Sequence, residues 1–203
     1  MKLITLLFII LLSTTVARCQ SGAELMNMGN TQFLRGNYTL ALPYFTQATQ
    51  GNTTITKANY MAGLCNYNLG SYALANTYFT NELAIDSTCA QAYYFKSLIA
   101  KYNIDSALQY INKAISLQPN NISYLTTKAQ LYYVHQHYYN SITWYQKALT
   151  INSRMDEAYY YVGYSYYYLG KQAKACNNWE KIVELDDFDN QEFIINNCKT
   201  TIK

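Results

Sequence analysis

Histidine, cysteine and acidic residues supply most enzyme and metal sites, and in this sequence they form no familiar catalytic or metal-binding pattern. The two histidines, His135 and His137, are separated by a single residue and have no carboxylate or thiol nearby in the sequence. The acidic residues between 184 and 192 lack the Asp-x-Asp-x-Asp-Gly spacing of a calcium loop. No glycine-rich phosphate loop, Gly-x-Ser-x-Gly turn or His-Glu-x-x-His helix occurs. We therefore predict a non-catalytic protein with no metal site and no cofactor.

The composition favours a helical protein with a real core. Half of the 203 residues are hydrophobic and 13% are charged, which excludes a disordered chain. Fifteen basic residues against twelve acidic ones give a formal net charge of +3, so we expect no nucleic-acid partner. Proline occurs only twice, as expected of a helical chain, whereas tyrosine is abundant, with 23 residues.

Residues 1–20 have the pattern of a signal peptide. Lys2 is followed by the apolar run Leu3–Leu12, interrupted only by Thr5, and small residues lead to Ala17. The run is shorter than the roughly 20 residues that span a bilayer, so no transmembrane span is expected in the mature chain. The alternative to a signal peptide is an ordinary buried helix at the N-terminus. A bacterial lipoprotein would have a small residue before its acceptor cysteine, but Arg18 precedes Cys19, which disfavours lipidation.

A period of about 34 residues runs through the rest of the chain. Each segment contains two helical patterns, and the second repeats a frame of small–x3–large apolar–x2–small or apolar residues, with Glu82 in the last position of one copy. The frame starts at Ala41, Ala75, Ala107, Ser141 and Ala175. This i, i+4, i+7 spacing places three side chains on one helix face. The predicted repeats are 22–55, 56–89, 90–121, 122–155 and 156–189, followed by a C-terminal capping helix over 190–203.

Small residues also recur in the first helical pattern of each segment. They lie twelve residues before the start of the frame, at Gly29, Gly63, Ala129 and Gly163, and ten residues before it at Ser97 in the shortened third segment. We interpret them as the contact points of two antiparallel helices, which approach closely where small residues face each other. Gly36, Gly70 and Gly170 fit left-handed C-caps, and Ser153 with Asp156 fits a capping box.

These motifs resemble the tetratricopeptide repeat (TPR), which has an aromatic residue or leucine, then Leu-Gly, Tyr and Ala-x3-Phe-x2-Ala. The fifth segment is similar through Tyr159, Gly163, Tyr166, Ala175 and Trp179. Only Pro119 matches the closing proline of the repeat, and the third segment is two residues short. The resemblance covers 22–189 and implies an all-α fold, a right-handed α-solenoid of about five helix pairs with a terminal capping helix.

The cysteines fit an exported protein of this type. Exported bacterial repeat proteins often have a similar Ala-Cys-x-x-Trp stretch and a terminal cysteine, which implies a disulfide between Cys176 and Cys198. Two buried thiols are the alternative. Cys65 and Cys89 are predicted to be unpaired, and no Cys-x2-Cys zinc pattern occurs.

The family resemblance also implies a binding surface. TPR ligands usually contact the concave face that the first helices form, and here the corresponding positions are rich in tyrosine. These positions are Tyr60, Leu64, Tyr67, Tyr94, Leu98, Lys101, Gln130, Tyr133, Tyr160, Tyr164, Tyr167 and Tyr168. Tyrosine gives large amphipathic contacts at low entropy cost. The alternative is that A/T-rich codons and packing explain the tyrosines. The tyrosines predicted to pack at framework positions of the repeat are Tyr72, Tyr138, Tyr145, Tyr159 and Tyr166.

The predicted function is therefore a non-catalytic scaffold of the cell envelope that holds a peptide or protein segment in this tyrosine-rich groove. A module that binds glycan or cell-wall material is the alternative, and an outer-membrane assembly factor is a further one. The signal-like segment implies export, most simply to the periplasm, with outer-membrane association or secretion as other destinations. The partner's identity and the oligomeric state do not follow from the sequence.

Overall fold

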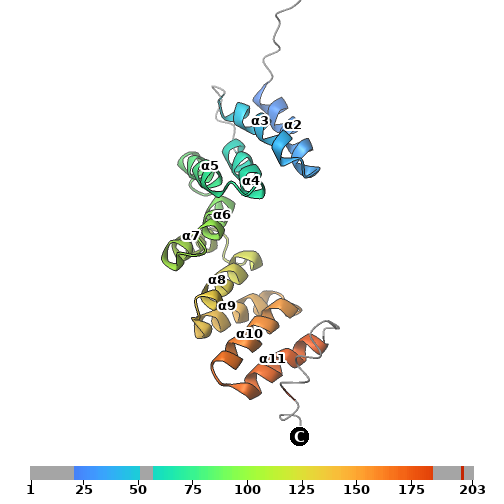
Figure 1. Ribbon diagram of the computed structural model, residues 1–203, viewed down its shortest axis with the longest axis vertical. Coiled ribbons are helices and arrows are strands. Elements are labelled where there is room, and N and C mark those ends of the chain that lie inside the picture. Colours follow the sequence, from blue (N-terminus) through green and yellow to red (C-terminus); the bar gives the residue numbers. More distant parts are fainter. Residues whose placement is uncertain (1–20, 51–56, 185–197, 199–203) are drawn as a thin grey trace, which may run out of the picture. The chain divides into compact units, whose positions relative to one another are not determined.

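The computed structural model describes residues 21–50, 57–184 and 198, and these residues form helices and no strand (Figure 1). The ten helices are α2 (Gly22–Leu34), α3 (Tyr38–Thr49), α4 (Ala58–Asn68), α5 (Tyr72–Ile85), α6 (Ala90–Ile99), α7 (Ile104–Leu117), α8 (Ile122–Val134), α9 (Tyr138–Ile151), α10 (Asp156–Tyr168) and α11 (Gln172–Glu184). The predicted signal peptide and, apart from Cys198, the predicted capping helix lie outside the described residues.

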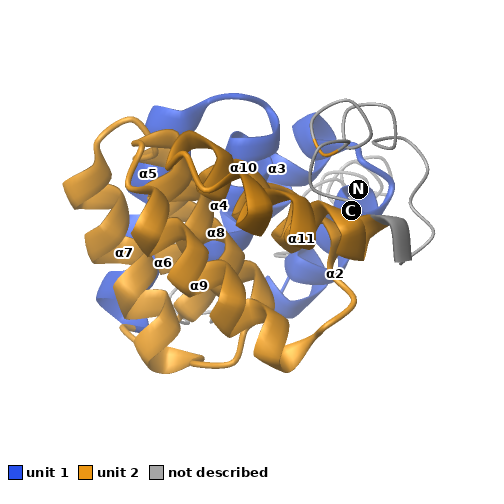
Figure 2. Cartoon of the chain, turned by 90° about the horizontal axis from the view of Figure 1, so that it is seen from below, with its two compact units in different colours: residues 1–86 blue, residues 87–203 orange. Residues whose placement is uncertain are grey.

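The helices pack as consecutive pairs and belong to two compact units (Figure 2). The first unit, residues 1–86, contains the pairs α2–α3 and α4–α5, and the second, residues 87–203, contains α6–α7, α8–α9 and α10–α11. Glycines with φ of 70–77° at Gly36, Gly70 and Gly170 end the first helix of three pairs, as predicted. Gln136, with φ of 62°, takes this place between α8 and α9.

The repeated frame forms the core of every second helix. The first and middle positions are fully buried or nearly so in α3, α5, α7, α9 and α11, including Phe45, Ile111 and Trp179. Tyr145 is also completely buried, whereas Tyr72, which was likewise predicted to pack at a framework position, is 52% exposed. Tyr72 occupies the first turn of α5, where its ring contacts Tyr67 at the surface.

The glycines of the first helices lie against aromatic rings and not against small residues, which corrects the predicted contact. A Cβ atom added to Gly29 would lie 2.6 Å from Phe45, and one added to Gly63 would lie 2.6 Å from Phe79. Gly163 has the same relation to Trp179. The small residue therefore makes room for the large residue at the centre of the frame, sixteen positions later.

Glu82, the one charged residue in the last position of the frame, forms hydrogen bonds with the backbone at the start of α4. This nearly completely buried side chain of α5 accepts hydrogen bonds from the backbone N–H groups of Lys57 and Tyr60, each at 3.1 Å. Lys57 precedes α4 with φ of 75° and gives no side-chain cap. A carboxylate from the partner helix thus satisfies the first N–H groups of α4. Burial raises the pKa of Glu82, and the two N–H groups oppose that shift.

The predicted capping box at Ser153 and Asp156 is wrong. Met155 is the N-cap of α10, and it makes no side-chain hydrogen bond there. A complete capping box is present instead at the start of α2, between Ser21 and Glu24.

Two lysines of the second unit are buried in equivalent places of successive repeats. Lys96 lies over the ring of Tyr110 and Lys128 over the ring of Trp144, with Nζ 5.0 and 3.6 Å from the ring centroids. The Nζ atom of Lys128 also donates to Asn112 Oδ1 at 2.6 Å. Burial, and then the charge of Lys147, lower the pKa of Lys128 to about 8. The charged amine therefore costs folding free energy.

We expect Lys128→Met to stabilise the protein by about 1–2 kcal/mol at pH 7, because methionine fills the site without the cost of desolvating a charge. The folded pKa of about 8 lies below the ordinary 10.5, so wild type gains stability from this group as pH rises from 8 to 10.5. The advantage of the variant should shrink over that range. Urea unfolding at several pH values measures both effects. Lys113→Met, at an exposed site of α7, is the control, and a K128M protein less stable than wild type at pH 7 would contradict the expectation.

Candidate functional site

An apolar groove opens between α6 and α8 in the second unit. Its volume is about 340 Å³. The lining residues come from the end of α6, the turn that follows and the last turns of α8: Leu98, Lys101, Tyr102, Thr127, Gln130, Leu131 and Val134. We call this hollow the α6–α8 groove. Its size suits one or two side chains of a bound segment.

Helix periodicity explains one wall of the groove. Thr127, Leu131 and Val134 follow one another at i, i+4 and i+7 along α8, so they share a face. Leu131 is buried and forms the floor, whereas Val134 is 67% exposed and Tyr102 is 84% exposed at the mouth. An exposed valine and tyrosine beside an apolar hollow are the contacts that a docked partner would cover.

Polar contacts fix both sides of the groove. A ring nitrogen of His135, Nε2, lies 3.0 Å from the backbone oxygen of Lys101, which joins the end of α8 to the turn after α6. Gln130 donates to Glu157 of α10 at 2.6 Å. Among the lining residues only Lys101 carries a charge at neutral pH. The site is thus an apolar hollow with a basic group at its edge.

A second exposed feature of this unit is made of tyrosines from α10 and its neighbours. Tyr160, Tyr164, Tyr167 and Tyr168 occur at i, i+4, i+7 and i+8 on α10, so they lie along one side of the helix. Tyr133 from the end of α8 and Tyr138 from the start of α9 join them. We call these six residues the tyrosine patch.

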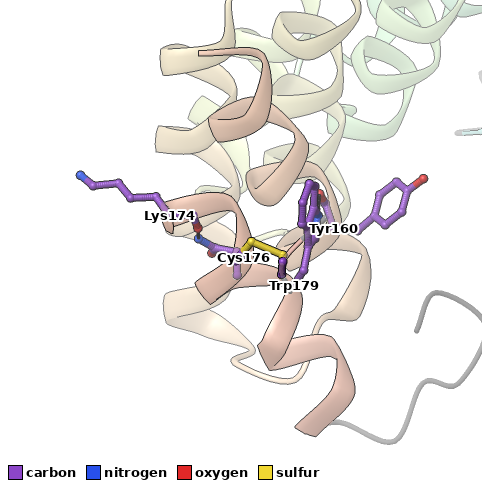
Figure 3. Close-up of a disulfide and its surroundings, with 6 residues drawn as sticks. Tyr160, Lys174, Cys176 and Trp179 are labelled. Atoms are coloured by element: carbon purple, nitrogen blue, oxygen red, sulfur yellow. Dashed lines mark hydrogen bonds between the residues drawn. A yellow bond between two sulfur atoms is a disulfide. The ribbon is translucent and has the colours of Figure 1, made fainter. Parts of the chain in front are cut away.

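The rings of the tyrosine patch hold one another in place. Tyr138 and Tyr168 stack with centroids 5.1 Å apart and planes 17° apart, and Tyr160 and Tyr164 are 4.7 Å apart. Beneath them, the buried Trp179 lies 5.1 Å from Tyr164, and its Nε1 donates to the backbone oxygen of Tyr160 (Figure 3). The exposed rings are therefore ordered before any ligand arrives.

Two hydroxyls of the tyrosine patch stay protonated. Burial is the main cause that raises the pKa of Tyr133 and of Tyr164, and hydrogen bonds to Tyr168 and Tyr160, respectively, add to it. Each of the two groups therefore remains a neutral phenol, hydrogen-bonded to another tyrosine, across the physiological pH range.

The predicted surface residues fall into four places. Leu98, Lys101 and Gln130 line the α6–α8 groove, and Tyr133, Tyr160, Tyr164, Tyr167 and Tyr168 belong to the tyrosine patch. Tyr94 is half-buried and packs on Tyr124 of α8, 5.1 Å away. Tyr60, Leu64 and Tyr67 belong to α4 in the other unit, where Leu64 is buried. The structure thus brings eight of the twelve residues into two features of one unit.

Four lining residues of the groove were not in the predicted set. Tyr102 and Val134 each come one residue after a predicted surface residue, Lys101 and Tyr133 respectively, and both are exposed. Thr127 and Leu131 lie deeper on α8. Large side chains at the thirteenth position of successive repeats, Tyr102 in 90–121 and Val134 in 122–155, were the signal that could have found the groove mouth.

The described residues contain no cluster of metal ligands and no membrane-spanning helix. Within 21–50, 57–184 and 198, no three of the histidine, cysteine, aspartate and glutamate side chains gather as metal ligands. None of the helices in these ranges is both long and apolar enough to span a bilayer.

Cys176 and Cys198 form a disulfide beside Trp179, as the family resemblance implied (Figure 3). Their Cα atoms are 5.6 Å apart. Cys65 and Cys89 are buried and belong to no disulfide, as predicted. The disulfide therefore borders the core that supports the tyrosine patch.

Comparisons with known proteins agree on the repeat. Two family models, both described as tetratricopeptide repeat, match residues 90–121 and 157–186. A TPR repeat-containing protein of Methanocaldococcus jannaschii, MJ1428, is 34% identical over 95 residues, which are 46% of this chain. The chain spans only 17% of the length of that curated relative.

Solved structures share the fold. MamA from Desulfovibrio magneticus RS-1 (residues 41 to the end) has a TM-score of 0.75 at 20% identity over 81% of this chain and 94% of its own. YrrB, described as a TPR protein with an unusual peptide-binding site, has a TM-score of 0.72 at 16% identity over 89% of this chain and 92% of its own. Helix pairs, repeat motifs and these likenesses together show that the chain contains tetratricopeptide repeats and has the α-solenoid fold of TPR proteins.

Proposed function

We propose that the protein is a non-catalytic scaffold that binds a segment of another polypeptide in the α6–α8 groove. A repeat fold of this kind supports protein–protein interaction in general. The observation that carries the finer proposal is the groove itself, an apolar hollow with an exposed Val134 and Tyr102 at its mouth. The peptide-binding site in YrrB's description supports the same kind of ligand.

The groove favours a segment with an aliphatic or aromatic anchor next to an acidic residue. The anchor would cover Leu98, Leu131 and Val134, and the acidic group would face Lys101. Most of the binding energy is expected from the anchor, because a rim ion pair is screened by water.

We further propose that the scaffold works outside the cytoplasm, in the periplasm. The proposal rests on residues 1–20, whose basic start, apolar run and small residues fit an export signal. Cell fractionation with N-terminal sequencing of the mature chain tests it. A cytoplasmic protein that retains Lys2 would exclude export.

Site-specific photo-crosslinking in the cells that make the protein tests the groove. A benzoylphenylalanine placed at Val134 should give a discrete adduct with another polypeptide, identified by mass spectrometry. The same probe at Ile151, which is exposed on the second helix α9, should not give that adduct. Adducts of equal yield at both positions, or at neither, would contradict a polypeptide partner in the groove.

Val134→Asp should weaken binding of that partner by at least about tenfold, since it puts a charge on the apolar wall. The thermal midpoint should stay within about 2 °C of wild type, because Val134 is mostly exposed. Titration calorimetry with the identified segment measures the change, and Ile151→Asp is the matched control. Unchanged affinity in V134D would show that the segment binds elsewhere.

A further inference from the structure

We propose that the tyrosine patch binds a proline-rich segment in the polyproline II conformation. The inference rests on the proposed function and names the chemistry of a partner segment. It concerns the surface that Tyr133, Tyr138, Tyr160, Tyr164, Tyr167 and Tyr168 form, not the α6–α8 groove.

The tyrosines of α10 are spaced to match the repeat of a polyproline II helix. Tyr160 and Tyr167 are seven residues apart on α10, which places them on one helix face with about 10 Å of rise between them. In a polyproline II helix, residues three apart face the same side at about 9 Å. Two prolines of such a segment can therefore contact the two ends of the α10 row, with the ring of Tyr164 between them.

Contacts among the rings of the patch reduce the conformational entropy that binding would cost. Tyr168 is 55% exposed, yet its ring stacks on Tyr138 and lies 5.7 Å from Tyr167. Trp179 supports both Tyr164 and Tyr167 from below. The patch is already ordered, and a polyproline II segment loses little freedom on binding, so flat contacts between rings suffice for measurable affinity.

The patch offers hydroxyl groups and no charged side chain. A polyproline II segment has no internal hydrogen bonds, so its carbonyl groups need donors, and the hydroxyls of the exposed Tyr167 and Tyr168 can supply them. Besides burial, only other tyrosine side chains raise the pKa of Tyr133 and Tyr164. The charge of Glu157, by contrast, also raises the pKa of Tyr145 and Tyr161. The patch itself is thus uncharged and fits an uncharged segment.

The same polarity disfavours a sugar. Sugar hydroxyl groups need several hydrogen bonds in fixed directions, and carboxylate and amide side chains supply these best. All six side chains of the patch end in phenols, each with a single donor. A proline-rich segment needs only aromatic faces against its rings and a few donors for its carbonyl groups, and the patch has both.

Titration calorimetry with an acetylated, amidated decaproline and the full mature protein tests the inference. We expect saturable binding at submillimolar peptide and no heat from a glycine–serine peptide of equal length. Tyr167→Ala and Tyr168→Ala should each weaken binding about three- to tenfold. Tyr139→Ala removes an exposed tyrosine of α9 outside the patch and should leave binding unchanged.

Three results would overturn the inference. They are no heat at millimolar decaproline, equal affinity in wild type and in the Tyr167 and Tyr168 variants, and binding of maltohexaose or a chitin oligosaccharide in place of decaproline. Both variants are at exposed positions, so circular dichroism should show a native fold. An adduct at Val134 without decaproline binding would refute only this inference, whereas no adduct at Val134 would refute the proposed groove.

Discussion

Gly163→Ala should destabilise the second unit by about 2–3 kcal/mol, one of the largest effects expected of a single methyl group in this protein. The added Cβ would come within 2.5 Å of Trp179 Cδ1 and still closer to Nε1. Trp179 cannot retreat easily, because it is almost completely buried among Ala175, Cys176 and Ile182. Its Nε1 is also fixed by the backbone oxygen of Tyr160.

Equilibrium unfolding in urea, followed by tryptophan fluorescence, measures this loss. Gly170→Ala is the control, since a Cβ there meets no atom within 4 Å and costs only the strain of a φ of 70°, about 1 kcal/mol. Trp179→Leu makes room, so the double variant G163A/W179L should lose less than the sum of the two single variants. A G163A protein within 0.5 kcal/mol of wild type would show that the contact is not tight.

The same contact explains why the helix pairs could be predicted from the sequence. The small residue packs directly against a large residue sixteen positions later, so a change in the size of one requires a change in the other. Gly29 and Phe45 make the same contact in the first helix pair. The predicted partner of the glycine was nevertheless wrong. Spacing on one helix shows which side chains share a face, but not which residue of the facing helix lies opposite.

The groove was predicted only in part because it depends on several helices at once. Leu98 and Gln130 follow from repeat positions, but the hollow also needs Tyr102 after α6 and Leu131 on α8. The third repeat is two residues short at this turn, which shifts residues beyond Tyr102 relative to the other repeats. Glu82 shows a similar limit, since its hydrogen bonds to α4 are long-range and leave no local pattern.

Loss of the disulfide should lower the free energy of unfolding by about 3 kcal/mol, the other large effect that we expect. The reason is that the disulfide closes a loop with a sequence separation of 22 residues. Cys176 belongs to the last described helix pair, and the end of a repeat array unfolds first when it is not tied. We therefore expect Cys176→Ala/Cys198→Ala to lower the thermal midpoint. Amide hydrogens of α11 should exchange faster, and those of α6 should change little.

Reduction provides the matched control, because a reducing agent should destabilise wild type and leave the double variant unchanged. Burial raises the pKa of Cys65 to about 12, so that thiol stays protonated and should resist alkylation in the native protein. In denaturant, prior reduction should add two alkyl groups to the intact mass of wild type and none to the double variant. Equal labelling with and without reduction would rule out the bond. Equal stability of wild type and double variant would show that the disulfide does not stabilise α11, and that the packing of Ala175, Trp179 and Ile182 against α10 holds this helix in place.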